Sequence, residues 1–107
     1  MSHVEVVHRD GRAVVSIRGD LDLASTGAFE EAAALAESVY GPRLYVDLSD
    51  LAFIDSSGLG ALTRLHRRLA GCDGGGLTVI VVPGGRIERI FRCIGLDRAM
   101  DVHRPRR

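Results

Sequence analysis

The stretch FIDSSGLG, from Phe53 to Gly60, gathers an acid, two hydroxyls and two glycines at one point of the chain. The apolar residues before Asp55 are typical of the end of a buried strand, and the residues after it begin a helix. A helix N-terminus has free backbone N–H groups and a positive dipole end, so it suits a carboxylate or a phosphate. A phosphate on Ser56 would be compatible with such a fold and would add about two negative charges beside Asp55.

Two interpretations of this junction remain open. In the simpler one, Ser56 or Ser57 caps the helix and Asp55 favours its positive end. Capping does not explain Gly58 and Gly60, each of which costs roughly 0.5–1 kcal/mol against alanine inside a helix. In the second interpretation, the two glycines are present because another molecule must come close to this turn. On that interpretation a larger side chain at Gly58 changes the stability by no more than about 1 kcal/mol.

The chain carries no motif of a familiar catalytic or metal site. It has no Walker loop, Rossmann glycine fingerprint or HExxH sequence, and its four histidines lack ligand spacing. Ser56 has no GxSxG elbow, and at ~1.5 Å per helical residue His66 lies on the order of 15 Å away, too far to activate it. We therefore expect no enzymatic activity, no metal and no cofactor.

Length and composition predict one domain spanning residues 1–107, with 46% hydrophobic residues and 14 basic against 14 acidic side chains. The charge balance gives no reason to expect direct nucleic-acid binding. The longest apolar run, 77–82, is too short to span a membrane, and the N-terminus has no apolar signal region, so we predict a cytoplasmic protein with no membrane attachment. Cys72 and Cys93 are expected to be reduced, with Cys93 near the core.

The elements that position the junction can be predicted from patterning. Asp10-Gly11 between two β-rich runs indicates an antiparallel hairpin, whose second strand has an apolar face made by Ala13, Val15 and Ile17. An acidic turn follows, and Ser25 is predicted to cap a helix over 26–40. Gly41-Pro42 ends this helix, whose apolar residues recur at helical spacing: Phe29, Ala32, Ala36 and Val39.

The rest of the chain alternates strands and helices. A strand over 43–49 and a short connection at 50–53 lead to a helix starting near Ser57, with an inner stripe of Leu59, Leu62, Leu65 and Leu69. A buried strand over 77–82, a helix that ends at Gly95 and a short strand at 101–103 complete the pattern. The sequence therefore predicts an α/β fold. Its sheet is mixed but largely parallel, opened by the antiparallel hairpin and packed with helices.

The segment VDLSDLAFIDSSGLGAL, 46–62, closely resembles the signature of anti-sigma factor antagonists, which are small STAS-domain proteins. RGDLDLAS and VPGGRIERIFRCIGLD extend the resemblance over nearly the whole chain. It implies that Ser56 is phosphorylated by a serine kinase that is itself the anti-sigma factor. The unmodified protein would bind this kinase and free the sigma factor, the phosphorylated form would release it, and a phosphatase would reset the switch.

The resemblance also implies a partner-binding face, made of Asp20, Asp22, Asp55, Ser56, Ser57, Gly58, Leu59 and Gly60. From the residues alone, Asp20 and Asp22 are equally well explained as turn residues. Members of the family usually carry a further helix after the last strand, where this sequence has a short basic tail at 104–107, so that helix is expected to be missing.

Two other functions remain open for a domain of this kind. One is a STAS module that is not phosphorylated and serves as a scaffold in a signalling assembly or a membrane transporter complex. The other is nucleotide binding, although no phosphate loop in the sequence supports it. An accessible Ser56 favours the switch, whereas a Ser56 side chain buried in a helix cap favours the scaffold.

Overall fold

The computed structural model describes residues 2–105 and begins with the predicted hairpin, β1 (His3–Arg9) and β2 (Arg12–Leu21). The two strands are antiparallel, and Arg9 lies opposite Arg12 on either side of the two-residue turn. Asp10 and Gly11 have φ angles of 55° and 74°, the positive values that a tight hairpin turn requires. Ala13, Val15 and Ile17 are buried, as their alternation predicts.

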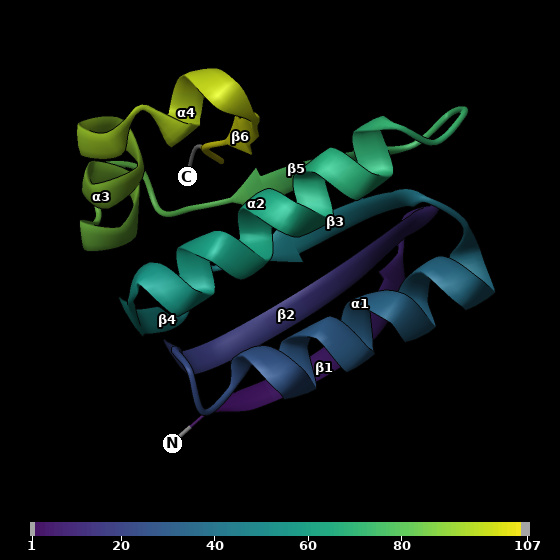
Figure 1. Ribbon diagram of the computed structural model, residues 1–107, viewed down its shortest axis with the longest axis horizontal. Coiled ribbons are helices and arrows are strands. Elements are labelled where there is room, and N and C mark those ends of the chain that lie inside the picture. Colours follow the sequence, from purple (N-terminus) through teal and green to yellow (C-terminus); the bar gives the residue numbers. More distant parts are fainter. Residues whose placement is uncertain (1, 106–107) are drawn as a thin grey trace.

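β2 is the strand on which the sheet is built. β3 (Arg43–Asp47) pairs with it in parallel, followed by β5 (Gly76–Ile80) and the short β6 (Asp101–His103), so that the order is β1-β2-β3-β5-β6. Only the β1–β2 pair is antiparallel among these neighbours. This confirms the predicted mixed, largely parallel sheet, which Figure 1 shows behind its helices.

One element differs from the prediction. The segment expected to be a connection at 50–53 is largely a strand, β4 (Leu51–Ile54), which pairs in parallel with the end of β2. A register shift lies between Gly19 and Asp20, and Leu21 is opposite Ile54. β4 is short and pairs only with the extension of β2 beyond β3, so local patterning does not identify it. It fixes the start of the following helix next to the end of β2.

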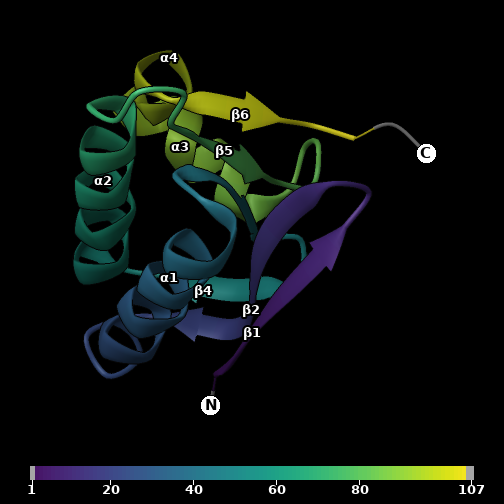
Figure 2. The same ribbon diagram turned by 90° about the vertical axis from the view of Figure 1, so that its right-hand side faces the viewer.

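The helices α1 (Thr26–Tyr40) and α2 (Ser56–Ala70) lie on the same side of the strands (Figure 2). The bounds of α1 are those predicted, but its buried residues are Phe29, Ala33 and Ala36, whereas Val39 is 60% exposed. α1 has more apolar positions than the sheet covers. In α2 the buried stripe includes Leu62, Leu65 and Leu69 as predicted.

The C-terminal third contains α3 (Arg86–Ile94) and the unpredicted short helix α4 (Leu96–Ala99). Gly95 ends α3 in the left-handed conformation, with φ 78°. Both cysteines are free thiols, but Cys93 is exposed on α3, so its predicted place near the core is wrong. Of the basic tail, Arg106 and Arg107 lie outside the described residues.

A single buried charge, Glu88 of α3, is found among the buried side chains of residues 2–105. Its carboxylate accepts the Gly84 N–H at 2.6 Å, pairs with Arg92 at 3.2 Å and is bonded by Arg104. The backbone donor and then the Arg104 side chain hold the pKa of Glu88 below its usual value. The contact joins the segment after β6 to the loop before α3.

This network predicts a pH dependence of stability. Because the folded-state pKa of Glu88 lies below its unfolded value, its stabilising contribution is present above the unfolded pKa and is lost as the pH falls through the folded one. Glu88→Gln should therefore lower the free energy of unfolding at neutral pH and weaken its decline in acid, as measured by urea denaturation across the acid range. Glu31→Gln, at an exposed position of α1, should leave the profile unchanged. Matching profiles for Glu88→Gln and the parent would contradict the prediction.

Candidate functional site

The turn between β4 and α2 is closed by its acid. Asp55 is the N-cap of α2, and its Oδ1 accepts the backbone N–H of Gly58 at 3.0 Å. Capping by Ser56 or Ser57, which the simpler of the two interpretations required, is therefore wrong. Aspartate and serine side chains can both cap a helix by accepting its free backbone N–H groups. Here Asp55 occupies the N-cap position, from which its oxygen reaches the N–H of the third helical residue.

Capping by Asp55 leaves the serines available. Ser56 is the first residue of α2 and is exposed, and its hydroxyl has no hydrogen-bond partner among residues 2–105. Ser57 beside it is half-buried, and Leu59 is half-buried against the core. Of the two hydroxyls, the one at Ser56 is the more accessible to another molecule.

Gly58 is required by the chain's own backbone. A Cβ at this position would lie 2.3 Å from the carbonyl oxygen of Leu21 and 2.9 Å from the Ile54 side chain. The same carbonyl accepts the Asp55 N–H at 3.2 Å. The expectation that Gly58 tolerates a larger side chain is therefore wrong, because the first turn of α2 rests directly on the end of β2.

Gly60 has a different environment. It is half-exposed, and the only atom close to an added Cβ is a terminal nitrogen of the flexible Arg64 side chain, at 3.3 Å. No backbone lies against it. Of the two glycines, Gly60 is the one whose missing side chain the fold does not explain, so the interpretation that a partner comes close applies to Gly60.

The acidic loop after β2 is held by its own side chains. Asp22 Oδ1 accepts the backbone N–H groups of Ala24 at 3.1 Å and Ser25 at 3.2 Å. Ser25 is buried and its hydroxyl donates to the Asp20 carbonyl at 2.8 Å, so its predicted side-chain cap on α1 is not formed. These bonds account for Asp22 as a turn residue.

The acidic loop and the α2 turn lie together because β2 and β4 are parallel and end at the same edge of the sheet. Figure 1 shows α1 and α2 both starting at this edge, on the left of the view. Two large apolar side chains are exposed on the flanking segments, Leu23 at 78% and Phe53 at 48%. We call this region the α2 N-terminal surface, made of Asp22, Leu23, Ser56 and Gly60; Phe53 is paired with Asp20 and alternates to the sheet face opposite to Ile54.

Leu23 and Phe53 are absent from the residues that the sequence singles out. Leu23 stands alone in a polar turn and follows no period, and Phe53 belongs to the strand that patterning missed. The sequence contains one signal for this surface. Leu23 is an apolar residue in a polar loop, where it has no core contact to make. An exposed leucine in the loop beside an accessible serine is typical of a protein-binding surface.

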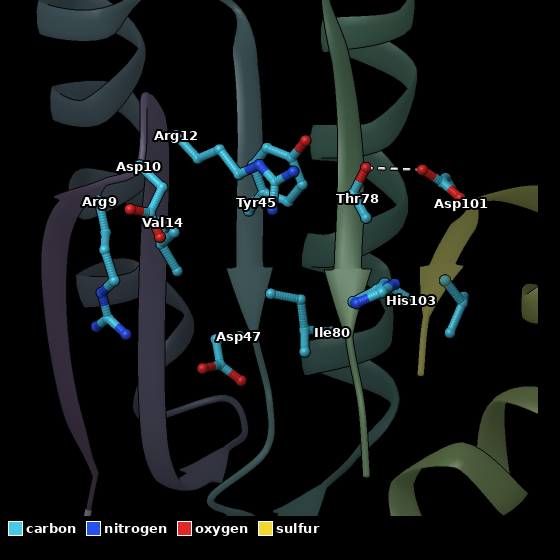
Figure 3. A pocket seen from close by; sticks show the side chains of 11 residues that line it. Arg9, Asp10, Arg12, Val14, Tyr45, Asp47, Thr78, Ile80, Asp101 and His103 are labelled. Carbon is cyan, nitrogen blue, oxygen red and sulfur yellow. Dashed lines mark hydrogen bonds between the residues drawn. The ribbon is translucent and has the colours of Figure 1, made fainter. Parts of the chain in front are cut away.

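A hollow of about 380 Å³ lies elsewhere, on the face of the sheet opposite α1 and α2 (Figure 3). Two pairs of its polar groups interact with each other: the Thr78 hydroxyl donates to Asp101 at 2.7 Å, and the Arg12 guanidinium lies 5.2 Å from the centre of the Tyr45 ring. These pairs occupy four of the side chains that a ligand would have to contact, so this hollow is the weaker candidate site.

Residues 2–105 lack the features of two further classes of site. No group of three or more histidine, cysteine, aspartate or glutamate side chains is placed to hold a metal ion. None of the helices in this part of the chain has the length and apolar content needed to cross a membrane.

Comparison with known proteins identifies the family. A model described as "Mlab, STAS domain" matches residues 4–102. The anti-sigma-F factor antagonist RsfB of Mycobacterium tuberculosis is 32% identical over 95 residues, which cover 89% of this chain and 75% of that protein. The chain therefore belongs to the STAS domain family.

Solved structures agree with this assignment. The crystal structure of an anti-sigma factor antagonist from Mycobacterium paratuberculosis superposes with a TM-score of 0.84 at 28% identity, covering 96% of this chain and 86% of that one. The anti-sigma factor antagonist SpoIIAA, solved in its unphosphorylated form, superposes with a TM-score of 0.63 at 19% identity, covering 92% and 97%. The second likeness shows a shared fold.

The two glycines give a matched test of the site. Gly58→Ala should lower the free energy of unfolding by about 1–3 kcal/mol, because the methyl group overlaps the Leu21 carbonyl. Gly60→Ala should leave it unchanged or raise it by up to about 1 kcal/mol, since alanine is the better helix former. Urea denaturation of both variants checks the contrast. Equal effects at the two positions would show that the contact of Gly58 with β2 is unimportant.

A second matched pair separates the two roles of Asp22. Asp22→Ala removes an acceptor that two backbone donors share and should cost about 1–2 kcal/mol of stability, whereas Asp22→Asn keeps the oxygen and should change it by less than about 0.5 kcal/mol. Thermal unfolding measures both. If Asp22→Asn is as damaging as Asp22→Ala, the hydrogen-bonding account of the loop is wrong. A stable Asp22→Asn that loses partner binding would show that the charge also contacts the partner.

Proposed function

We propose that this chain is an anti-sigma factor antagonist that works by partner switching. In its unmodified form it binds an anti-sigma factor that is also a serine kinase, and the sigma factor is released. The kinase phosphorylates Ser56, the complex dissociates, and a phosphatase restores the starting state. This cycle takes place in the cytoplasm and needs neither a cofactor nor catalysis by the chain itself.

One observation carries the proposal: Ser56 is exposed at the start of α2 with its hydroxyl unbonded, while Asp55 provides the cap. A serine that served only to cap would have its oxygen turned onto the backbone. The names of the relatives support the role of antagonist. The accessible hydroxyl favours the phosphorylated switch over the fixed scaffold.

The α2 N-terminal surface has the composition of a partner interface. Leu23 offers an apolar side chain that a partner can cover, and Ser56 and Gly60 lie on the neighbouring helix turn, where the flexible Arg64 side chain is the nearest neighbour of Gly60. Binding would remove water from this surface and therefore from the Ser56 side chain. Asp20, Asp55, Ser57 and Leu59 flank the contact. Gly58 supports it by setting the position of the turn.

The same phosphate has opposite consequences for the fold and for the complex. At the start of α2 it gains only about 0.3–1 kcal/mol from the helix dipole, so the domain stays folded. In the interface its charge must lose water beside Asp55, or meet like charge, which costs several kcal/mol. Because each 1.4 kcal/mol is about tenfold in affinity, binding should fall by about two orders of magnitude or more.

Variants at the two serines test this switch. With anti-sigma kinases from the same genome and ATP, intact mass should rise by one phosphate in the parent and in Ser57→Ala, but not in Ser56→Ala. In calorimetry, Ser56→Ala should bind the kinase whether or not ATP is present, and Ser56→Asp should bind more weakly than the parent. All three variants should unfold near the parental temperature.

Phosphorylation at Ser57, or at neither serine, would overturn the assignment of Ser56. If no such kinase binds the unmodified chain, the antagonist role itself is wrong, and a scaffold function of the domain is the remaining interpretation. Binding without phosphorylation would retain the antagonist role and exclude the covalent switch.

A further inference from the structure

A second surface of the domain is open along its first strand. β1 has seven residues and stands at one end of the strand order, with only β2 beside it in the part of the chain described, whereas β6 at the opposite end has three. β1 contains no proline, and its charged residues, Glu5 and Arg9, are of opposite sign. A strand of this length presents a row of unpaired main-chain groups to another strand.

The register of the hairpin shows which groups face outward. Arg9 and Arg12 flank a two-residue turn, where the flanking residues exchange main-chain hydrogen bonds. Because hydrogen-bonded and non-bonded pairs alternate, the N–H and C=O groups that point away from β2 belong to Val4, Val6 and His8. A strand that adds to this edge must bond to these three residues.

The helix above this edge has an apolar flank. One flank of α1 faces α2, which it meets through ion pairs of Glu30 with Arg64, at 3.3 Å, and of Glu37 with Arg68. At about 100° per residue, the opposite flank carries no charge and consists of Ala28, Ala32, Leu35 and Val39. Leu35 and Val39 are 59% and 60% exposed, and α1 contacts β1. An uncovered apolar flank beside an open strand edge indicates an interface.

We propose that a second copy of this chain pairs with it along β1, antiparallel and about a two-fold axis, with Val7 opposite Val7. This register places Glu5 of each copy opposite Arg9 of the other, so that two ion pairs flank the axis. It also places Val6 opposite His8, and these residues have outward-facing main-chain groups. About four main-chain hydrogen bonds form across the junction.

Neighbouring symmetric registers fit less well. Centring the pair on Val6 sets His3 against Arg9 and leaves Glu5 opposite a valine. Centring it on Glu5 places two carboxylates opposite each other, which is destabilising. A two-fold interface requires a self-complementary strand, and the spacing of Glu5, Val7 and Arg9 meets this requirement. The apolar flanks of the two α1 helices then face one another over the extended sheet.

The test measures the mass of the full chain by sedimentation over a wide range of concentration, without any kinase, so its outcome does not depend on the proposed function. The 11.5 kDa chain should reversibly double its mass. Glu5→Arg should weaken the dimer at least about tenfold by setting like charges opposite each other, and Glu5→Arg combined with Arg9→Glu should restore it. Val39→Glu should also weaken it, whereas Ile94→Glu, an equally exposed apolar position on α3, should not.

Circular dichroism and thermal unfolding confirm that each variant is folded before its mass is interpreted. A chain that remains monomeric at the highest concentrations overturns the proposal. So does a dimer that Glu5→Arg and Val39→Glu leave unchanged, since it must use another face. If the double charge exchange fails to restore what Glu5→Arg removes, the Val7 register is wrong and the proposal fails with it.

Discussion

The contact on which the site depends is the close approach of the first turn of α2 to the end of β2. The Leu21 carbonyl accepts the Asp55 N–H, and Gly58 lies so near the same oxygen that a Cβ there would be 2.3 Å from it. This contact fixes both the position and the rotation of α2. With Gly58 facing the sheet, Ser56 and Gly60 lie on parts of the turn that β2 does not cover. The accessibility of the serine is therefore a consequence of core packing.

The division of work between Asp55 and Ser56 follows from this arrangement. Asp55 uses one oxygen to satisfy a backbone N–H that would otherwise have no partner, so the hydroxyl is not needed for the helix. A negative charge that is already present at the helix end reduces what the dipole can offer a second one. A phosphate on Ser56 can thus enter without unfolding the domain, yet its charge stays exposed to a partner. A serine that is accessible and not needed as a cap is suited to reversible modification, whereas a serine that caps the helix is not.

Much of this fold can be predicted from local sequence because its signals act over a few residues. Asp10-Gly11, the α1 helix to Gly41 and the end of α3 at Gly95 are each specified by backbone preferences close in the chain. What patterning misses depends on contacts distant in sequence. β4 exists only because β2 extends beyond β3, and the role of Gly58 depends on a carbonyl 37 positions earlier. The prediction for Val39 failed for a different reason. Helical spacing shows which residues share a face but not which face is buried.

The geometry of a sheet allows the two surfaces to be occupied together. The α2 N-terminal surface lies where β2 and β4 end, along the direction of the strands, whereas β1 offers its side, across that direction. α1 separates them, with one flank joined to α2 through Glu30 and Glu37 and the other above β1. A partner at Ser56 and a second copy at β1 therefore approach from different sides. A pair of domains joined at β1 would present two serines that can be modified independently, so that the dimer could hold two, one or no partners according to its phosphorylation.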